Sequence, residues 1–321
     1  MTSYDGLPCS AAALDLPLPG SATRVTGWLC VEQPGAWGRD VIGDEVLGPE
    51  ITPALAALAK AAHVRPTLIR RPGRKEFSGV RTVLIASSRP EGSWCERFEI
   101  TDLKQLLDLD LHLLNGPAPK IGVPVTDPIL VCAHGKRDQC CARLGRPIAA
   151  RLAAAHPDRV WECSHTGGHR FAPAVVLLPT GLTYGRIDEE TAVDMIATVD
   201  RGLLPLTGFR GRSCSSPVEQ VAEIAVREHL STTADWLSAA GIDDLTATET
   251  TLDASPAHGA ALPVVAPTDA TYAGAALVTH RDGRQWLVTT RTHAHTPRQA
   301  SCGASPKPAT ALVPAHIEPL H

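Results

Sequence analysis

The first third of the chain alternates apolar runs and amphipathic stretches in the order that α/β proteins show. The run RVTGWLCVEQ at residues 24–33 predicts a strand, and apolar positions at helical spacing predict a helix near residues 53–62. RPTLIRR and RTVLIASS predict two further strands, and DLKQLLDLDLHLLNG returns to helical periodicity. We therefore expect an N-terminal α/β segment over residues 1–120, which ends in the proline-rich stretch PAPKIGVPVTDP.

The next segment, residues 121–205, has shorter and more apolar runs. PILVC predicts a buried strand, HGKRDQC a loop, and RPIAARLAAAH a helix that ends at the following His-Pro pair. RVWECS, AVVLL and LTYGRI predict three more strands, which the helix DEETAVDMIATVDRGL follows. This order predicts a compact α/β domain.

The last segment, residues 206–321, has a mixed α+β pattern. Helical periodicity covers about residues 217–230 and 233–240. AALVTHRDGRQWLVTT predicts a hairpin that turns at Asp282-Gly283. The chain closes in a Pro/Ala-rich tail, whose final twenty residues we expect to be poorly ordered.

Composition and charge exclude several classes of protein. Hydrophobic residues make up 44% of the 321 residues and charged residues 20%, as in soluble globular proteins. The net charge of −4, with no basic face, argues against a nucleic-acid partner. No stretch is apolar for long enough to span a membrane and no signal-peptide pattern is present, so we expect a cytoplasmic protein without a membrane partner. Nine cysteines, an odd number, argue for thiols used in metal or redox chemistry rather than a disulfide framework.

Potential metal ligands concentrate in one short stretch of the chain. It contains Cys132, His134, Cys140, Cys141, Cys163, His165 and His169. Cys132 ends a predicted strand and Cys141 begins a predicted helix, so chain reversal through Gly135 can bring the two sulfurs together. His165 and His169 flank Thr-Gly-Gly, where glycine lets the backbone aim two imidazoles at one point. The sequence therefore predicts a metal centre with one cysteine pair and one histidine pair.

Other interpretations of these residues remain open at this point. The same ligand set suits a mononuclear zinc site that would stabilise a binding module. The vicinal Cys140-Cys141 pair suggests a thiol-redox or peroxide-handling oxidoreductase of thioredoxin-like fold, although no C-x-x-C motif is present. His134 suits a hydrogen bond to a ligand better than ligation itself, and Cys163 suits packing within its strand. Motifs typical of hydrolases and kinases are absent from the sequence.

VCAHGKRDQCC and HTGGH resemble the C-x-H-G-x-R-D-x-x-C and H-x-G-G-H pattern of the sucrase/ferredoxin-like family. GWLCVEQPGAWGRD and SCGASPKP resemble the segments that flank this pattern in the family. The resemblance implies an α/β fold in which a thioredoxin-like ferredoxin domain lies between an N-terminal α/β segment and a C-terminal α+β segment. It also implies a [2Fe–2S] cluster with Cys132, Cys141, His165 and His169 as ligands. Cys141 closes the ten-residue motif, and Cys140 stands one position earlier.

This ligand set has electrostatic consequences. Two thiolates and two neutral imidazoles leave an oxidised [2Fe–2S] core neutral, whereas four thiolates leave it doubly negative. By analogy with Rieske centres, we expect a higher reduction potential than in all-cysteine ferredoxins, and a pH dependence because imidazole N–H groups titrate. The resemblance thus implies a one-electron carrier that serves a reductase or an oxidoreductase, rather than an enzyme with its own substrate. No carboxylate pair indicates glycosidase activity.

Overall fold

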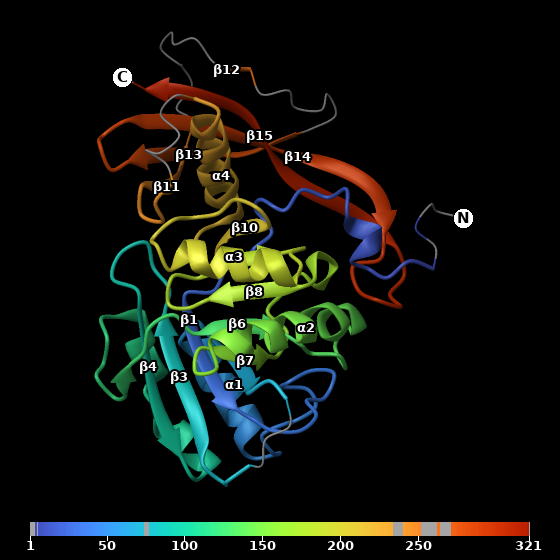
Figure 1. Ribbon diagram of the computed structural model, residues 1–321, viewed down its shortest axis with the longest axis vertical. Coiled ribbons are helices and arrows are strands. Elements are labelled where there is room, and N and C mark those ends of the chain that lie inside the picture. Colours follow the sequence, from blue (N-terminus) through green and yellow to red (C-terminus); the bar gives the residue numbers. More distant parts are fainter. Residues whose placement is uncertain are drawn as a thin grey trace. The chain divides into compact units, whose positions relative to one another are not determined.

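A computed structural model describes residue 4 and residues 6–73, 77–233, 240–251, 262–263 and 271–320. The chain divides into two compact units (Figure 1). We call Val25–Glu189 the continuous unit, and Met1–Arg24 with Glu190–His321 the split unit. The three-segment division with boundaries near residues 120 and 205 stays a prediction. None of the described helices has both the length and the apolar character needed to cross a bilayer.

The continuous unit is built on a large mixed sheet. Its strands are β1 (Gly27–Glu32), β2 (Val64–Arg70), β3 (Arg81–Ser87), β4 (Trp94–Ile100), β5 (Val123–Pro124), β6 (Ile129–Cys132), β7 (Val160–Cys163), β8 (Ala174–Leu177) and β9 (Leu182–Gly185). Within this unit the order across the sheet is β9-β8-β6-β7-β2-β1-β3-β4-β5. β1 pairs in parallel with β2 and β6 pairs in parallel with β7, while β2 and β7 meet in antiparallel register. The predicted α/β class of this part of the chain is confirmed.

Helices cover the sheet of the continuous unit, and its apolar side chains alternate between the two faces. The helices are α1 (Ile51–Ala61), α2 (Gln139–Ala155) and the short 3-10 helices η2 (Leu103–Asp108), η3 (Leu111–Asn115) and η4 (His169–Phe171). Leu29 and Val31 of β1 pack into the core that includes α1, whereas Trp28 and Cys30 pack into the opposite core. Both faces are therefore buried, as the continuous apolar run of β1 requires.

The stretch from residue 102 to residue 116 differs from the prediction. It forms η2 and η3 instead of one helix, because Asp102 and Asp110 each cap a separate start. The Asp110 side chain accepts a hydrogen bond from the amide of His112, which begins the second helix. Strand β4 was also missed, because its polar positions interrupt the apolar pattern.

The split unit combines helices with a second, antiparallel sheet. Its elements are η1 (Ala11–Ala13), α3 (Glu189–Val199), β10 (Phe209–Arg212), α4 (Pro217–Ser231), β11 (Leu245–Thr250), β12 (Leu262–Pro263), β13 (Thr271–His280), β14 (Gln285–Arg298) and β15 (Lys307–Leu320). The sheet order is β11-β13-β14-β15-β12. Helix α4 lies against this sheet (Figure 1). Its apolar side chains share a core with those of the sheet.

Two predictions for the split unit can be compared with the structure, and a third cannot. The hairpin that turns at Asp282-Gly283 is confirmed as β13–β14. The expectation of a poorly ordered tail is wrong, because residues 307–320 form β15 along β14. Pro314 is accommodated where the register shifts between Thr289 and Thr290, as expected for proline in a strand. The helix predicted near residues 233–240 lies largely outside the described residues.

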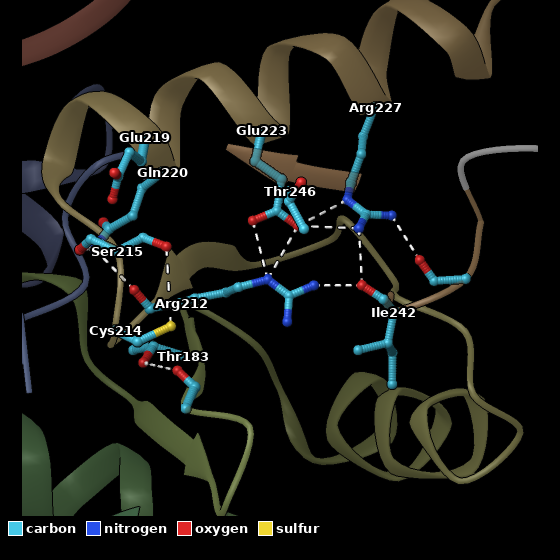
Figure 2. A network of polar contacts seen from close by, with 12 residues as sticks. Thr183, Arg212, Cys214, Ser215, Glu219, Gln220, Glu223, Arg227, Ile242 and Thr246 are labelled. Carbon is cyan, nitrogen blue, oxygen red and sulfur yellow. Dashed lines mark hydrogen bonds and ion pairs between the residues drawn. The ribbon is translucent and has the colours of Figure 1, made fainter. Parts of the chain in front are cut away.

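A buried ion network connects α4 to β10 and the chain after residue 240 (Figure 2). The Glu223 carboxylate accepts hydrogen bonds from Arg212 at 3.1 Å and from Arg227 at 3.0 Å. Both guanidinium groups also donate to the carbonyl oxygen of Ile242. Each buried charge therefore has a partner, which is the condition under which such groups are tolerated in a core.

Candidate metal centre

The candidate site lies at the carboxyl ends of β6 and β7. Because these strands are parallel neighbours, Cys132 lies opposite Cys163, and the chain leaves both strands at the same sheet edge. The segment with His134 follows β6, and the segment with His165 follows β7. Sites commonly form at this edge because the connections after parallel strands meet there.

Helix α2 brings Cys141 to the end of β6. The Asp138 side chain caps the helix by accepting a hydrogen bond from the amide of Cys140 at 2.9 Å. Gly145 then lets the helix approach the strand, since a Cβ at this position would lie 2.1 Å from the carbonyl oxygen of Cys132. Only glycine permits this close approach of the helix to the strand. Because Cys141 lies in the first turn of the same helix, the approach also brings it to Cys132.

Three of the four predicted ligands converge. The sulfurs of Cys132 and Cys141 and a ring nitrogen of His165 all lie within 4.8 Å of one another. The two cysteines are 1% and 0% exposed, whereas His165 is half-buried. Cys140 is not part of this group, so the residue that meets Cys132 is Cys141, the one that closes the sequence motif.

His169 lies beside His165 rather than within the group of three. Gly167 and Gly168 have φ angles of 102° and 70°, values that favour glycine, and they fold the chain back on itself. The two imidazole rings stack with their centroids 4.6 Å apart and an interplanar angle of 29°. The Nδ1 atoms of both rings are buried without a hydrogen-bond partner among the described residues. Such a buried, unsatisfied nitrogen is costly unless a ligand completes it.

The electrostatics of the site distinguish its cysteines. The hydrogen bond with the Cys141 thiol lowers the pKa of Cys132 well below its ordinary value, and His165 acts in the same direction. Burial raises the pKa of Cys163 well above its ordinary value, and the neighbouring Cys132 adds to this effect. Cys132 is therefore suited to be a thiolate ligand, whereas Cys163 remains a packing thiol. Burial, followed by the His165 ring, lowers the pKa of His169, which favours the neutral imidazole that binds a metal.

His134 supports the site but cannot be a ligand in this arrangement. Its Nδ1 accepts a hydrogen bond from the amide of His165 at 3.2 Å, and its Nε2 lies 2.6 Å from the carbonyl oxygen of Gly38. Both ring nitrogens are therefore occupied, and the Nε2–H tautomer is fixed. The edge of the ring meets Trp37 with centroids 5.8 Å apart. The segment QPGAWG thus helps to hold the loop of His165.

Arg65 is a site residue that the sequence analysis missed. Its Nη2 donates to the carbonyl oxygen of His165 at 2.6 Å, across 100 positions of sequence. Arg65 lies in β2, and nothing in the local sequence pattern of that strand indicates a contact with the histidine pair His165 and His169. Together with His134 it fixes the amide and the carbonyl oxygen of the same residue, so the backbone of His165 is held on both sides.

The donor set limits what the site can bind. Thiolates and imidazoles suit zinc, iron–sulfur and copper centres, whereas calcium and magnesium require oxygen ligands. The four residues thus form a candidate site for a soft or borderline metal, with the cysteines in the interior and the histidines toward solvent.

Comparison with known proteins identifies a family that the chain resembles. Residues 18–211 match a family model described as sucrase/ferredoxin-like. The matched range spans more than half of the chain and contains all four candidate ligands. No curated protein and no solved structure matches the chain.

Proposed function

Because the chain belongs to the sucrase/ferredoxin-like family, we propose that it binds a [2Fe–2S] cluster and carries single electrons. Cys132, Cys141, His165 and His169 would hold the cluster. The observation that carries this proposal is the convergence of Cys132, Cys141 and His165 beside a stacked second histidine. The three ligand atoms come from three separate segments of the chain, and such convergence in a buried position calls for a common partner.

The residues present fit the proposed group in kind and in state. Two cysteine sulfurs and two imidazoles match the ligand types of clusters with mixed ligation. The lowered pKa of Cys132 favours its thiolate form, and the lowered pKa of His169 favours its neutral ring. The buried Nδ1 atoms of His165 and His169 are the polar groups that ligation, or a hydrogen bond formed with it, would satisfy.

When bound, a [2Fe–2S] cluster supplies a one-electron redox couple. The burial of the ligand residues determines how water and a redox partner would reach the cluster. Cys132 and Cys141 are buried, so they exclude water from their side of the site. His165 and His169 are half-buried, so their rings offer the shorter path to solvent and to a docked redox partner. A proton held on a histidine ring nitrogen would link the potential to pH.

The thioredoxin-like assignment of this domain belongs to the proposal. The unit β6–α2–β7 with antiparallel β8 on the far side of β6 supports it, since a parallel βαβ crossover followed by antiparallel strands matches that architecture. A reductase or an oxidoreductase in the cytoplasm is the proposed partner. In this role the protein would be an electron carrier without a substrate of its own.

Optical and EPR spectroscopy with iron and sulfide analysis of the anaerobically purified full chain tests the proposal. We expect a red-brown protein with about two iron and two sulfide per monomer and an EPR signal that appears on one-electron reduction. A colourless protein that contains one zinc would contradict it and favour a zinc-stabilised binding module. A metal-free protein that turns over peroxide or disulfide would instead favour a thiol oxidoreductase.

A further inference from the structure

Two thiols of the split unit, those of Cys9 and Cys302, are far apart in sequence but lie close together in the structure. Cys9 precedes the short helix η1, and Cys302 lies in the turn between β14 and β15. Their sulfurs lie within 4.8 Å of each other. The amide of Cys9 donates a hydrogen bond to the sulfur of Cys302 at 3.4 Å, across 293 positions of sequence. The two sulfurs are not bonded to each other in the structure.

The segments that carry these thiols are held together by a buried arginine. Arg298, at the end of β14, is 3% exposed. It donates to the carbonyl oxygen of Ala12 at 3.1 Å, forms an ion pair with Asp15, and lies over the ring of Tyr4 at 4.5 Å. These contacts fix the N-terminal segment beside the β14–β15 turn, so the approach of the two sulfurs is a property of the fold rather than of two mobile chains.

We propose that Cys9 and Cys302 form a redox-active dithiol, which small-molecule disulfides convert into a Cys9–Cys302 disulfide. The distance between the sulfurs needs only a local adjustment to reach bonding distance. Cys302 lies in a turn that includes Gly303, which has a φ of 78° and is exposed. Neither cysteine is among the four candidate ligands of the proposed cluster.

The exposure of the two thiols sets the order of the exchange. Cys302 is half-buried and reachable from solvent, whereas Cys9 is 0% exposed. The Cys302 thiolate attacks the small disulfide RSSR, forms a Cys302–SR mixed disulfide and releases the first thiol, RSH. The Cys9 thiolate then attacks the sulfur of Cys302 and displaces the second RSH. The protein loses two electrons and two protons, and RSSR gains them as two RSH.

Two buried thiols of the continuous unit, Cys95 and Cys163, show the usual effect of burial on a cysteine. Burial raises the pKa of Cys95 to about 12 and the pKa of Cys163 well above its ordinary value. Such thiols remain protonated and inert. The sulfur of Cys302, in contrast, is partly exposed and accepts a backbone N–H donor, the kind of contact that stabilises a thiolate.

Peptide mapping of the full chain tests the proposal. The protein is equilibrated with oxidised glutathione, quenched with acid, alkylated under denaturing conditions and digested with trypsin without reduction. Because trypsin cuts after Arg24 and Arg298 but not before Pro308, the disulfide would join peptide 1–24 to peptide 299–321, each with one cysteine. We expect this linked pair to become the main form of both peptides and to disappear when excess reduced glutathione is added.

Two variants complete the test. Cys302→Ser should abolish the linked pair and leave Cys9 available for alkylation once the protein is denatured. Cys214→Ser, which removes another buried thiol of the split unit, should leave the yield unchanged. Separate glutathione adducts on peptides 1–24 and 299–321, or full alkylation of both in the wild-type protein, would overturn the proposal. The iron content and visible spectrum report on the cluster separately, so failure of one proposal does not affect the other.

Discussion

His134 holds His165 through a hydrogen bond from the His165 amide to the His134 Nδ1 atom, 3.2 Å long. The opposite nitrogen of the same ring lies 2.6 Å from the carbonyl oxygen of Gly38. One imidazole thus connects the segment after β7 to a loop near the start of the continuous unit. The position of a candidate ligand therefore depends on residues that are far from it in sequence.

Replacing His134 with Leu should loosen the site without removing a ligand. The substitution leaves the His165 amide and the Gly38 carbonyl oxygen without their partner, which costs about 1–3 kcal/mol in the free energy of unfolding. We expect the purified variant to retain less iron per monomer and to lose it faster to a chelator. His156→Leu, at the half-buried C-cap of α2, is the matched control. Unchanged iron retention in His134→Leu would show that the hydrogen bond does not position the ligand.

Gly145→Ala should separate the helix from the strand. Its Cβ would lie 2.1 Å from the carbonyl oxygen of Cys132, so α2 must move and carry Cys141 away. We expect destabilisation of about 1–3 kcal/mol, seen as faster hydrogen exchange in α2, together with reduced metal content. Gly116→Ala is the control, because the nearest atom to its added Cβ is 3.7 Å away. Equal exchange rates and metal content in both variants would contradict this role of Gly145.

The adjacent cysteines should respond differently to substitution. Cys141→Ser and Cys132→Ser should lose most of the bound metal, because a hydroxyl is a poor substitute for a thiolate. Cys140→Ser should retain it, since Cys140 is not in the group with Cys132 and His165. Metal and sulfide analysis of the three variants gives the comparison. Loss in Cys140→Ser with retention in Cys141→Ser would reverse the assignment.

The histidines control potential and pH dependence if the proposed cluster is present. His165→Cys or His169→Cys replaces a neutral ring with a negative thiolate and removes one ionisable N–H. The reduction potential should therefore fall and depend less on pH. Protein-film voltammetry across about pH 6 to 10 measures both effects. An unchanged potential and pH slope in both variants would mean that neither histidine is a ligand.

The ion network of the split unit should make it sensitive to acid. Burial alone would raise the pKa of Glu223, but Arg212 and Arg227 together outweigh it and lower that pKa. The stabilisation is therefore fully present above the ordinary glutamate pKa of 4.5 and is lost as the pH falls through the lower, folded-state value. Hydrogen exchange in α4 at neutral and acidic pH would show the loss as a fall in protection.

Substitution at this network should be costly even at neutral pH. Glu223→Gln leaves two buried guanidinium groups without a counter-charge, and we expect a loss of about 3–5 kcal/mol in the local free energy of opening. Glu228→Gln, on the exposed side of the same helix, should have little effect. Similar protection of α4 in the two variants would show that the network contributes specificity rather than stability.

The convergence of Cys132, Cys141 and His165 could be predicted because each position depends on local chain geometry. Cys132 ends a short apolar run that predicts a buried strand, and Cys141 follows a helix cap at Asp138. The glycines before His169 similarly indicate a tight reversal. Where local signals fix both the element and its end, the sequence also fixes which side chains meet there.

Contacts between distant segments could not be predicted in the same way. The hydrogen bond between His134 and Gly38 spans 96 positions, and the Arg65 contact with His165 spans 100. No periodic pattern encodes the antiparallel pairing of β2 with β7 that makes these contacts possible. The fit of Gly145 against Cys132 was missed for a related reason, because a helical glycine has no side chain to mark the face that it occupies.

The split unit has a consequence for the order of events during synthesis. The N-terminal segment of the split unit, up to Arg24, leaves the ribosome before the continuous unit. The sheet of the split unit, however, needs β15, which ends at Leu320. At about 5–20 residues per second, the 132 residues after Glu189 take roughly 7–26 s to make. During that time the continuous unit can already fold, while the N-terminal segment waits with its apolar side chains exposed. A chaperone that binds nascent chains should therefore engage the first 24 residues for longer than any later segment.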